Sequence, residues 1–188
     1  MIQQTLVLIK PDGVLRGIVG EIIQRFEKVG MKIVAIKMIQ APKEILEQHY
    51  YKDENWMKEK GELYKEKLKL PKETDPIPLG KNIVDGLIED TQISPIIAIV
   101  LEGHNAVKVV KKLTGPTNIE EAPPGTIRGD FSQDTFALAN KSNRPIITII
   151  HATDNPEVAS KEIGFWFSQS EIYSYKKPED DLHYRVRK

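Results

Sequence analysis

The 188-residue chain contains no cysteine. This absence excludes disulfides, thiolate metal sites and cysteine nucleophiles. Net charge is also absent, because 27 basic and 27 acidic residues cancel. A neutral chain does not favour a protein that holds nucleic acid mainly by bulk electrostatics. We therefore expect nucleic acid to be a secondary partner at most.

Long apolar runs are missing as well. The longest, such as IIAIVL at 96–101, are too short to span a bilayer. The opening residues MIQQTLVLIKPDG enter an apolar run without the basic segment or cleavage site of a secretory signal. At this length one well-packed domain is expected rather than two. The sequence predicts a single domain over residues 1–188, cytoplasmic and without a membrane partner.

The common nucleotide-binding signatures are absent. No G-x-x-x-x-G-K-[ST] segment occurs, since GKN at 80–82 lacks both the leading glycine and the hydroxyl. No G-x-G-x-x-G segment occurs either. A phosphate-binding function would therefore need a different kind of site.

Hydrophobic periodicity predicts strands alternating with helices. The predicted strands are 5–10, 32–40, 95–102 and 145–150, and the predicted helices are 18–30, 43–51, 105–113 and 157–167. This order indicates an α+β fold of the ferredoxin-like β-α-β-β-α-β kind. Such a sandwich has a four-stranded antiparallel sheet with helices on one face.

Three segments lie outside this pattern. Residues 52–82 alternate charge sign and end in proline-rich turn sequence, which predicts an inserted solvated helix and a loop at the periphery. Residues 114–130 are rich in glycine and proline, which predicts a long ordered loop of the kind that is often functional. Residues from about 170 to 188 form a C-terminal extension.

Five side chains form a candidate set for phosphate chemistry. Lys10 lies at a strand end in KPDG, Thr117 in the PTN loop and Arg128 between glycines in GTIRGD. His151 follows the apolar run 145–150, and Glu162 comes eleven residues later in the closing helix. A point charge, a bidentate fork and a neutral donor suit a polyphosphate. A histidine oriented by a carboxylate can attack its terminal phosphoryl group.

The lysine, arginine, histidine and glutamate of this set also have a structural interpretation. A strand-end lysine can be merely solvated, and an arginine in a glycine-rich loop can serve to hydrogen-bond carbonyls. A strand-end histidine can be a satisfied core residue, and a helix glutamate can face solvent. The residues alone do not establish that these side chains converge, so both interpretations stay open at this point.

Four ordered segments together resemble the nucleoside diphosphate kinase family. They are KPDGVLRGIVGEIIQRFE, LTGPTN, PPGTIRGDF and HATDNPEVASKEIGFWF. The resemblance covers residues 1–51 and 83–170. It implies ping-pong transfer of a γ-phosphoryl group from a nucleoside triphosphate, with ATP as the expected donor, to a nucleoside diphosphate. It also implies Mg²⁺ held mainly by the nucleotide phosphates, and a homo-oligomer of four or six subunits.

The resemblance implies a role for each matching residue. His151 matches the histidine that is phosphorylated at Nδ1, and Glu162 matches the carboxylate that orients its ring. Lys10 and Arg128 match the cations that neutralise the phosphates, and Thr117 matches a hydroxyl donor to the β-phosphate.

Two further positions complete this part of the implied site. Thr153 matches a hydroxyl close to the transferred group. Tyr50 matches a tyrosine that packs near the histidine.

The nucleoside end departs from the family pattern. Thr148 stands where the family has an asparagine that binds the sugar 3′-hydroxyl. Lys111 replaces an arginine, which keeps the charge but loses bidentate geometry. Val84 takes the place of the aromatic residue that stacks on the base, with Ile88 as an apolar wall and Trp56 as an alternative platform. These departures favour, as an alternative function, a catalytically impaired nucleotide-binding or scaffold protein on the same fold.

Overall fold

The computed structural model describes residues 2–51 and 53–183. Within them lies a four-stranded antiparallel sheet of order β2-β3-β1-β4. The strands are β1 (Ile2–Ile9), β2 (Lys32–Ile39), β3 (Ile96–His104) and β4 (Ile150–Ala152). The predicted ferredoxin-like α+β order is confirmed.

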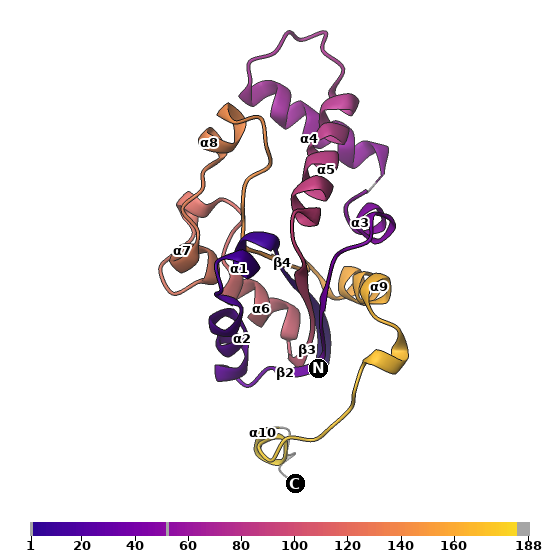
Figure 1. Cartoon of the computed structure of the whole chain (residues 1–188), viewed down its shortest axis with the longest axis vertical. Helices are drawn as coiled ribbons and strands as arrows, with labels where there is room; N and C mark the ends of the chain where they lie inside the picture. Colours follow the sequence, from indigo (N-terminus) through magenta and orange to yellow (C-terminus); the bar gives the residue numbers. More distant parts are fainter. Residues whose placement is uncertain (1, 52, 184–188) are drawn as a thin grey trace.

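Helices connect and surround these strands (Figure 1). They are α1 (Pro11–Leu15), α2 (Val19–Lys28), α3 (Lys43–Tyr50), α4 (Glu54–Lys67), α5 (Pro76–Gln92), α6 (Ala106–Thr114), α7 (Ile127–Phe131), α8 (Phe136–Lys141), α9 (Pro156–Trp166) and α10 (Asp180–His183), with 3-10 turns η1 (Ile119–Glu121) and η2 (Gln169–Glu171). Among the described residues, none of the helices is both long enough and apolar enough to cross a membrane.

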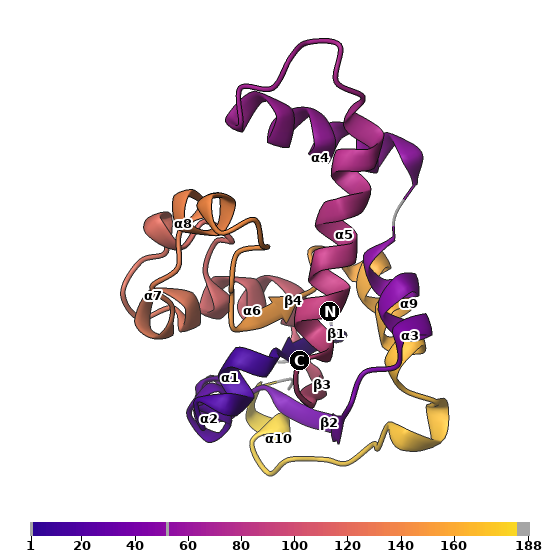
Figure 2. The ribbon, with the colours of Figure 1, turned by 45° about the horizontal axis from the view of Figure 1, so that its top comes forward.

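Both faces of the sheet are covered, which corrects the expectation of helices on one face only. Ile9 faces the layer of α2 and α6, where it joins a core cluster with Phe26. Leu8 faces the layer of α3 and α9 and clusters with Leu46 and Trp166. Figure 2 shows the two layers on opposite sides of the strands. The reason is visible in the strand sequences, because near-continuous apolar runs are typical of strands buried on both faces.

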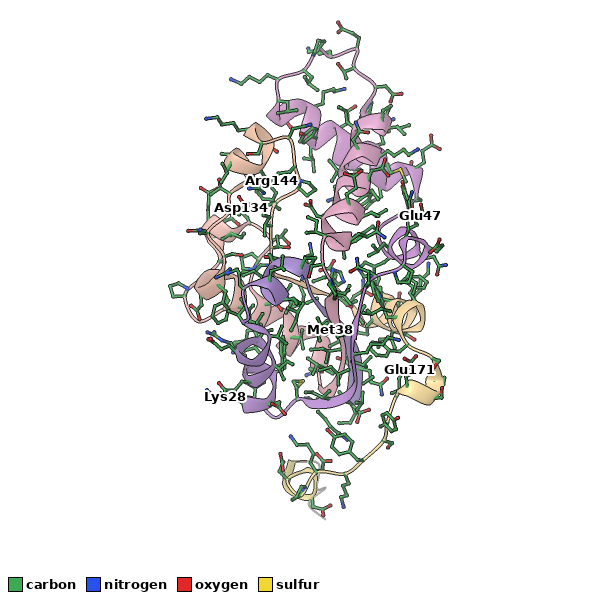
Figure 3. All side chains as sticks on the ribbon, viewed as in Figure 1. Lys28, Met38, Glu47, Asp134, Arg144 and Glu171 are labelled. Atoms are coloured by element: carbon green, nitrogen blue, oxygen red, sulfur yellow. The ribbon has the colours of Figure 1, made fainter. Side chains whose placement is uncertain are left out.

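The last strand is shorter than predicted and begins at Ile150, so the prediction of a strand over 145–150 is wrong. The amide of Ile147 donates to Asp134 Oδ2 at 2.8 Å instead of to a neighbouring strand. Asp134 is held by two hydrogen bonds from Arg144, of 2.6 and 3.0 Å, and these lower its pKa (Figure 3). This network fixes the segment before β4 as an ordered, non-strand connection.

The predicted insertion 52–82 folds as α4 and the start of α5, rather than as one helix and a loop. The two helices pack at their backbones because two glycines permit it. A Cβ on Gly61 would lie 1.7 Å from the Pro76 carbonyl oxygen, and one on Gly80 would lie 2.0 Å from that of Met57. Figure 1 shows α4 at the end of α5 that points away from the sheet. The insertion is peripheral, as predicted, while the later turns of α5 reach the core.

Candidate active site

His151 is the middle residue of β4, where it pairs with Leu8 of β1. Successive strand residues point to opposite faces of a sheet. Ile150 and Ala152 belong to the core cluster on the α2 and α6 side. His151 therefore points to the other side, toward α3 and α9.

A tight turn centred on Ile149 leads into β4. Its φ angle of +62° is in the left-handed region, which a β-branched residue rarely adopts. The amide of Ile150 donates to the Thr148 carbonyl at 2.6 Å, which closes a γ-turn. Such a conformation persists only where the surroundings enforce it. One enforcing contact is the Lys10 amide, which donates to the Ile149 carbonyl at 2.7 Å.

Arg128 supplies the other support for this turn. Its guanidinium donates to the carbonyls of Gly115 and Ile150 at 2.8 Å each and to that of Thr148 at 3.4 Å. The residue is only 5% exposed, and burial lowers its pKa to about 10, so it stays charged at neutral pH. The carbonyl-binding interpretation that the sequence left open therefore holds. In this arrangement the guanidinium is not an exposed fork for phosphate.

Glu162 reaches the histidine because of its place on α9. Asn155 caps this helix by accepting a hydrogen bond from the Val158 amide. The buried residues of α9 are Ala159, Glu162, Ile163 and Trp166, which is the stripe expected of an amphipathic helix. The Glu162 carboxylate, in the middle of this apolar stripe, faces the sheet and not solvent. The structural interpretation of a solvent-facing helix glutamate therefore does not hold.

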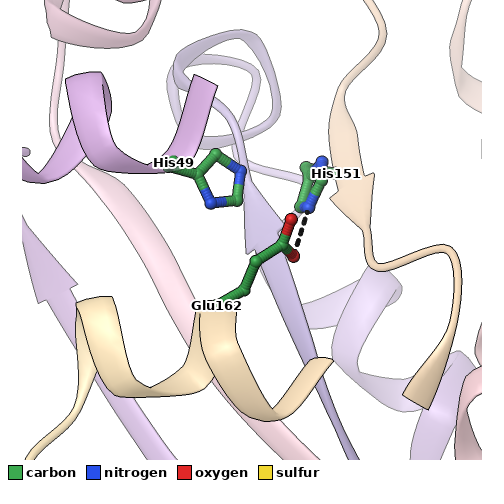
Figure 4. A group of neighbouring side chains, drawn as sticks. All are labelled: His49, His151 and Glu162. Atoms are coloured by element: carbon green, nitrogen blue, oxygen red, sulfur yellow. Dashed lines mark hydrogen bonds and ion pairs between the residues drawn. The ribbon is translucent and has the colours of Figure 1, made fainter. Parts of the chain in front are cut away.

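Glu162 holds one nitrogen of the His151 ring. Its Oε2 lies 3.1 Å from His151 Nε2 and accepts a second hydrogen bond, of 2.7 Å, from the Thr153 hydroxyl. Burial raises the pKa of Glu162, but the hydrogen bond and charge of His151, with help from His49 and Thr153, outweigh it and lower the pKa to about 2. The carboxylate is thus ionised at neutral pH. Figure 4 shows the other ring nitrogen, Nδ1, on the side away from Glu162.

A second histidine, which the sequence did not single out, completes the cluster. His49 of α3 is 2% exposed, and its ring meets the His151 ring edge-to-face at a centroid distance of 4.5 Å (Figure 4). Its Nδ1 accepts a 3.4 Å hydrogen bond from Trp166 Nε1. The available signal was its position three residues after the core residue Leu46, on the buried side of the helix.

Tyr50 and Thr153 contact the neighbours of His151, namely His49 and Glu162. The Tyr50 ring packs on His49, at 4.8 Å between centroids, and its hydroxyl lies 3.3 Å from the Thr91 hydroxyl. Thr153 is buried, and its hydroxyl donates to Glu162. Both residues therefore support the two groups that contact His151.

Lys10 lies at the junction of β1 and α1, directly beside the turn that precedes β4. Burial raises the pKa of Asp12 and of Asp90, and in both cases the charge of Lys10 opposes that rise. The lysine charge thus acts between α1 and α5. A phosphate at this position would meet a lysine whose charge already acts on two partly buried carboxylates.

Three other predicted nucleotide-binding residues, Thr117, Thr148 and Lys111, differ in their exposure and in their partners. Thr117 is exposed on the loop after α6, as a phosphate donor requires. Thr148 is buried and is the first residue of the γ-turn. Lys111 forms a 2.6 Å ion pair with the exposed carboxylate of Asp154, three residues after His151. A nucleotide phosphate would have to compete with Asp154 for this cation.

The prediction that Val84 and Ile88 face a base is wrong in this structure. They are 0% and 3% exposed and belong to the core cluster with Leu46. The half-buried side chains are one residue earlier on α5, at Ile83 and Leu87.

The rotation of α5 is set by contacts with Tyr51, directly after α3, and with Pro145, before β4. The Tyr51 hydroxyl donates to Asp85 at 2.5 Å, and this hydrogen bond raises the tyrosine pKa to about 12. On the neighbouring side of the helix, a Cβ on Gly86 would lie 3.0 Å from the Pro145 side chain.

We call Ile83, Leu87 and the opposing Pro145 the α5 wall. Trp56, the alternative platform, is a residue of α4 and packs against the core, with Lys60 over its ring at 5.6 Å.

One group of three potential metal ligands occurs in the described part of the chain, namely His49, His151 and Glu162, whose ligand atoms lie within 4.8 Å of one another. Mg²⁺ prefers oxygen ligands in octahedral geometry. Two imidazoles and a carboxylate that already accepts two hydrogen bonds do not suit this ion. These three side chains therefore do not make a protein cage for Mg²⁺. Their chemistry agrees better with an ion that arrives bound to the nucleotide phosphates.

The comparisons with known proteins agree on one family. The family model described as nucleoside diphosphate kinase matches residues 3–67 and 78–172. Within this span only residues 68–77, around the turn between α4 and α5, are left unmatched. The chain is 43% identical over 180 residues to a nucleoside diphosphate kinase of Pyrobaculum aerophilum, which covers 91% of this chain and 98% of that protein.

Solved structures give the same result. An NDP kinase from Pyrobaculum aerophilum superposes with a TM-score of 0.86 at 40% identity, over 93% of this chain and 100% of the other. The nucleoside-diphosphate kinase from Borrelia burgdorferi, solved as a transition-state mimic with vanadate and ADP, superposes with a TM-score of 0.79 at 36% identity, over 97% of both chains.

Proposed function

The chain belongs to the nucleoside diphosphate kinase family, and on this premise we propose that its phosphotransfer runs through phosphorylated His151. The observation that carries the proposal is the 3.1 Å contact between His151 Nε2 and the ionised Glu162. An imidazole held in this way keeps its proton on Nε2 and leaves the Nδ1 lone pair free to attack.

The transfer has two balanced halves. In the first, Nδ1 of His151 forms a bond to the γ-phosphorus while the bond to the β,γ-bridging oxygen breaks, and its electrons leave on the nucleoside diphosphate. The Nε2 proton stays in the hydrogen bond to Glu162, whose negative charge offsets the positive charge of the phosphorylated ring. In the second half, a terminal oxygen of another diphosphate attacks the phosphoryl group, and the electrons of the P–N bond return to Nδ1.

Cations lower the energy of both halves, since charge spreads over the equatorial oxygens of the phosphoryl group. We assign this role to Lys10 as a direct contact and to Arg128 as a charge behind the γ-turn. Thr117 is the exposed hydroxyl that can donate to a neighbouring phosphate. Family members generally use Mg²⁺, and the ion, when bound to the phosphates, neutralises part of their charge.

Labelling with γ-labelled ATP and Mg²⁺ tests the proposal. The wild-type protein should acquire acid-labile, base-stable label that GDP removes as GTP. His151→Ala should acquire none, while His104→Ala, which removes an exposed histidine at the end of β3, should behave as the wild type. Nucleotide binding without label in the wild type would favour the alternative, a non-catalytic nucleotide-binding protein.

We further propose that the chain assembles into a homo-oligomer of four or six subunits. Supporting this, the edge strand β2 exposes two apolar side chains, Ile36 at 49% and Met38 at 61%. Met38 is labelled in Figure 3. Light scattering coupled to size-exclusion chromatography measures the subunit number, and a monomer would contradict the proposal. A cytoplasmic location stays a prediction of the sequence.

A further inference from the structure

The side chain of His151 has a freedom that Glu162 alone does not remove. The χ2 torsion of histidine is broad and roughly two-fold. A half-turn of the ring would withdraw Nδ1 from the open side. It would also carry Nε2 away from Glu162 and toward the open side. One hydrogen bond of 3.1 Å opposes this rotation. A nucleophile that must present the same nitrogen in every cycle therefore benefits from a second constraint.

His49 is placed to supply that constraint. Its ring stands at 80° to the His151 ring, so the edge of one imidazole rests on the face of the other. A ring that turned about χ2 would move its own atoms into this neighbour. Interiors are packed closely enough that such an intrusion requires the neighbour to move.

The surroundings of His49 keep it from moving. The Tyr50 ring lies against it at 82° and the Trp166 ring at 77°, with centroid distances of 4.8 and 5.8 Å. Trp166 Nε1 can only donate a hydrogen bond, so His49 Nδ1 must be the unprotonated acceptor. This bond fixes both the tautomer and the orientation of His49. The buried ring is thus held by both Tyr50 and Trp166.

We propose that His49 is a positioning residue that fixes the plane of the His151 ring, so that Nδ1 and not Nε2 receives the phosphoryl group. The inference rests on the proposed function and deepens it. His49 need not touch the nucleotide to act in this way. Its effect should appear as the choice between two nitrogens, which a residue that merely stabilises the fold would not influence.

The test compares the phosphorylated forms of the wild type, His49→Ala, His49→Gln and His49→Phe, with His104→Ala as the control. Phosphorus-31 NMR in alkaline solution distinguishes a phosphoryl group on Nδ1 from one on Nε2. We expect Nδ1 alone in the wild type and the control. In His49→Ala we expect about one tenth or more of the label on Nε2 and about tenfold slower single-turnover labelling, with unchanged nucleotide affinity.

The two remaining variants separate the ring from its hydrogen bond. His49→Phe keeps an aromatic wall and should preserve Nδ1 selectivity. His49→Gln keeps an acceptor for Trp166 but removes the wall, so it should lose selectivity, and it decides the matter if His49→Ala does not fold. Phosphorylation only at Nδ1 in both His49→Ala and His49→Gln would overturn the inference, whatever the rate. A wild-type protein without label would remove the proposed function, and this inference with it.

Discussion

Two parts of the molecule carry the family chemistry in different ways. The histidine centre, formed by His49, His151, Thr153 and Glu162, joins three elements through contacts as short as 2.7 Å. The α5 wall consists of two half-buried apolar side chains of α5, Ile83 and Leu87, together with Pro145 from the connection before β4. The first is fixed by strand pleat and hydrogen bonds. The second depends on the rotation of α5, which distant contacts determine.

A substitution in the histidine centre and one in the α5 wall should therefore change different measured quantities. A change in the histidine centre should slow the formation of the phosphoenzyme while nucleotide affinity stays the same. A change in the α5 wall should alter the affinity and leave the chemical step intact. The predictions below test this division, beginning with the largest expected effect.

Glu162→Gln should have the largest effect. The side-chain amide can donate to Nε2 and so favour the tautomer with the proton on Nδ1, which cannot attack. We expect the single-turnover labelling rate to fall by about 10²- to 10⁴-fold, as when a catalytic histidine is held in the wrong tautomer. Thr153→Val, which removes only the second partner of Glu162, should cost less. A Glu162→Gln protein within about threefold of the wild-type rate would contradict the role of the carboxylate.

Ile88→Ala and Leu87→Ala form a matched pair on neighbouring positions of α5. Truncation of the buried Ile88 should lower the free energy of unfolding by about 2–5 kcal/mol. Truncation of Leu87 should lower it less and instead raise the KM for nucleotide several-fold, since apolar contact with a ligand is lost. Denaturant unfolding and steady-state kinetics measure the two quantities. A rise in KM for Ile88→Ala alone would show that the buried line of α5, and not the α5 wall, faces the nucleotide.

Gly61→Ala tests whether α4 holds the α5 wall in place. The new methyl group would clash with the Pro76 carbonyl, so α4 and α5 must separate. We expect a loss of about 1–3 kcal/mol in unfolding free energy, with a raised KM and normal labelling of His151. Gly20→Ala in α2 is the control, because its methyl group meets nothing within 4 Å and should stabilise the protein by about 0.4–1 kcal/mol. A normal KM in Gly61→Ala would show that the packing of α4 on α5 does not influence nucleotide binding.

The pH dependence of stability gives the smallest signal. The pKa of Glu162 is lowered from 4.5 to about 2 by folding. A lowered carboxyl pKa contributes stability that is fully present above the unfolded value and is lost as the pH falls toward the folded one. The difference in unfolding free energy between wild type and Glu162→Gln should therefore shrink between pH 5 and pH 2. Urea unfolding across this range measures it, and a constant difference would contradict the assignment.

Much of the histidine centre could be predicted from the sequence. The motif around His151 places a polar residue beside an apolar run, and the family resemblance pairs it with Glu162, whose burial on α9 only the structure shows. His49 could not be predicted with the same ease, because a histidine in an amphipathic helix carries no motif. Its role depends on α3 and β4 meeting across the sheet, which is a tertiary fact.

The α5 wall shows where sequence reasoning fails. An alignment across residues 52–82 leaves the helix rotation uncertain by one position, and one position turns a helix by about 100°. The rotation is settled by the hydrogen bond from Tyr51 to Asp85 and by the burial of Val84 in the core. The late start of the last strand, which was predicted over 145–150 and begins at Ile150, has a similar cause, since the long-range contact of Asp134 with Ile147 replaces strand pairing. Local patterns do not encode these partners.

The central claim is that His151 carries the phosphoryl group between the two half-reactions. Rapid-quench measurement with γ-labelled ATP, followed by addition of GDP, tests it most directly. We predict close to one label per chain on His151, formed and discharged at least as fast as steady-state turnover. Turnover that proceeds with no label on His151, or with label that forms or discharges more slowly than turnover, would contradict the account.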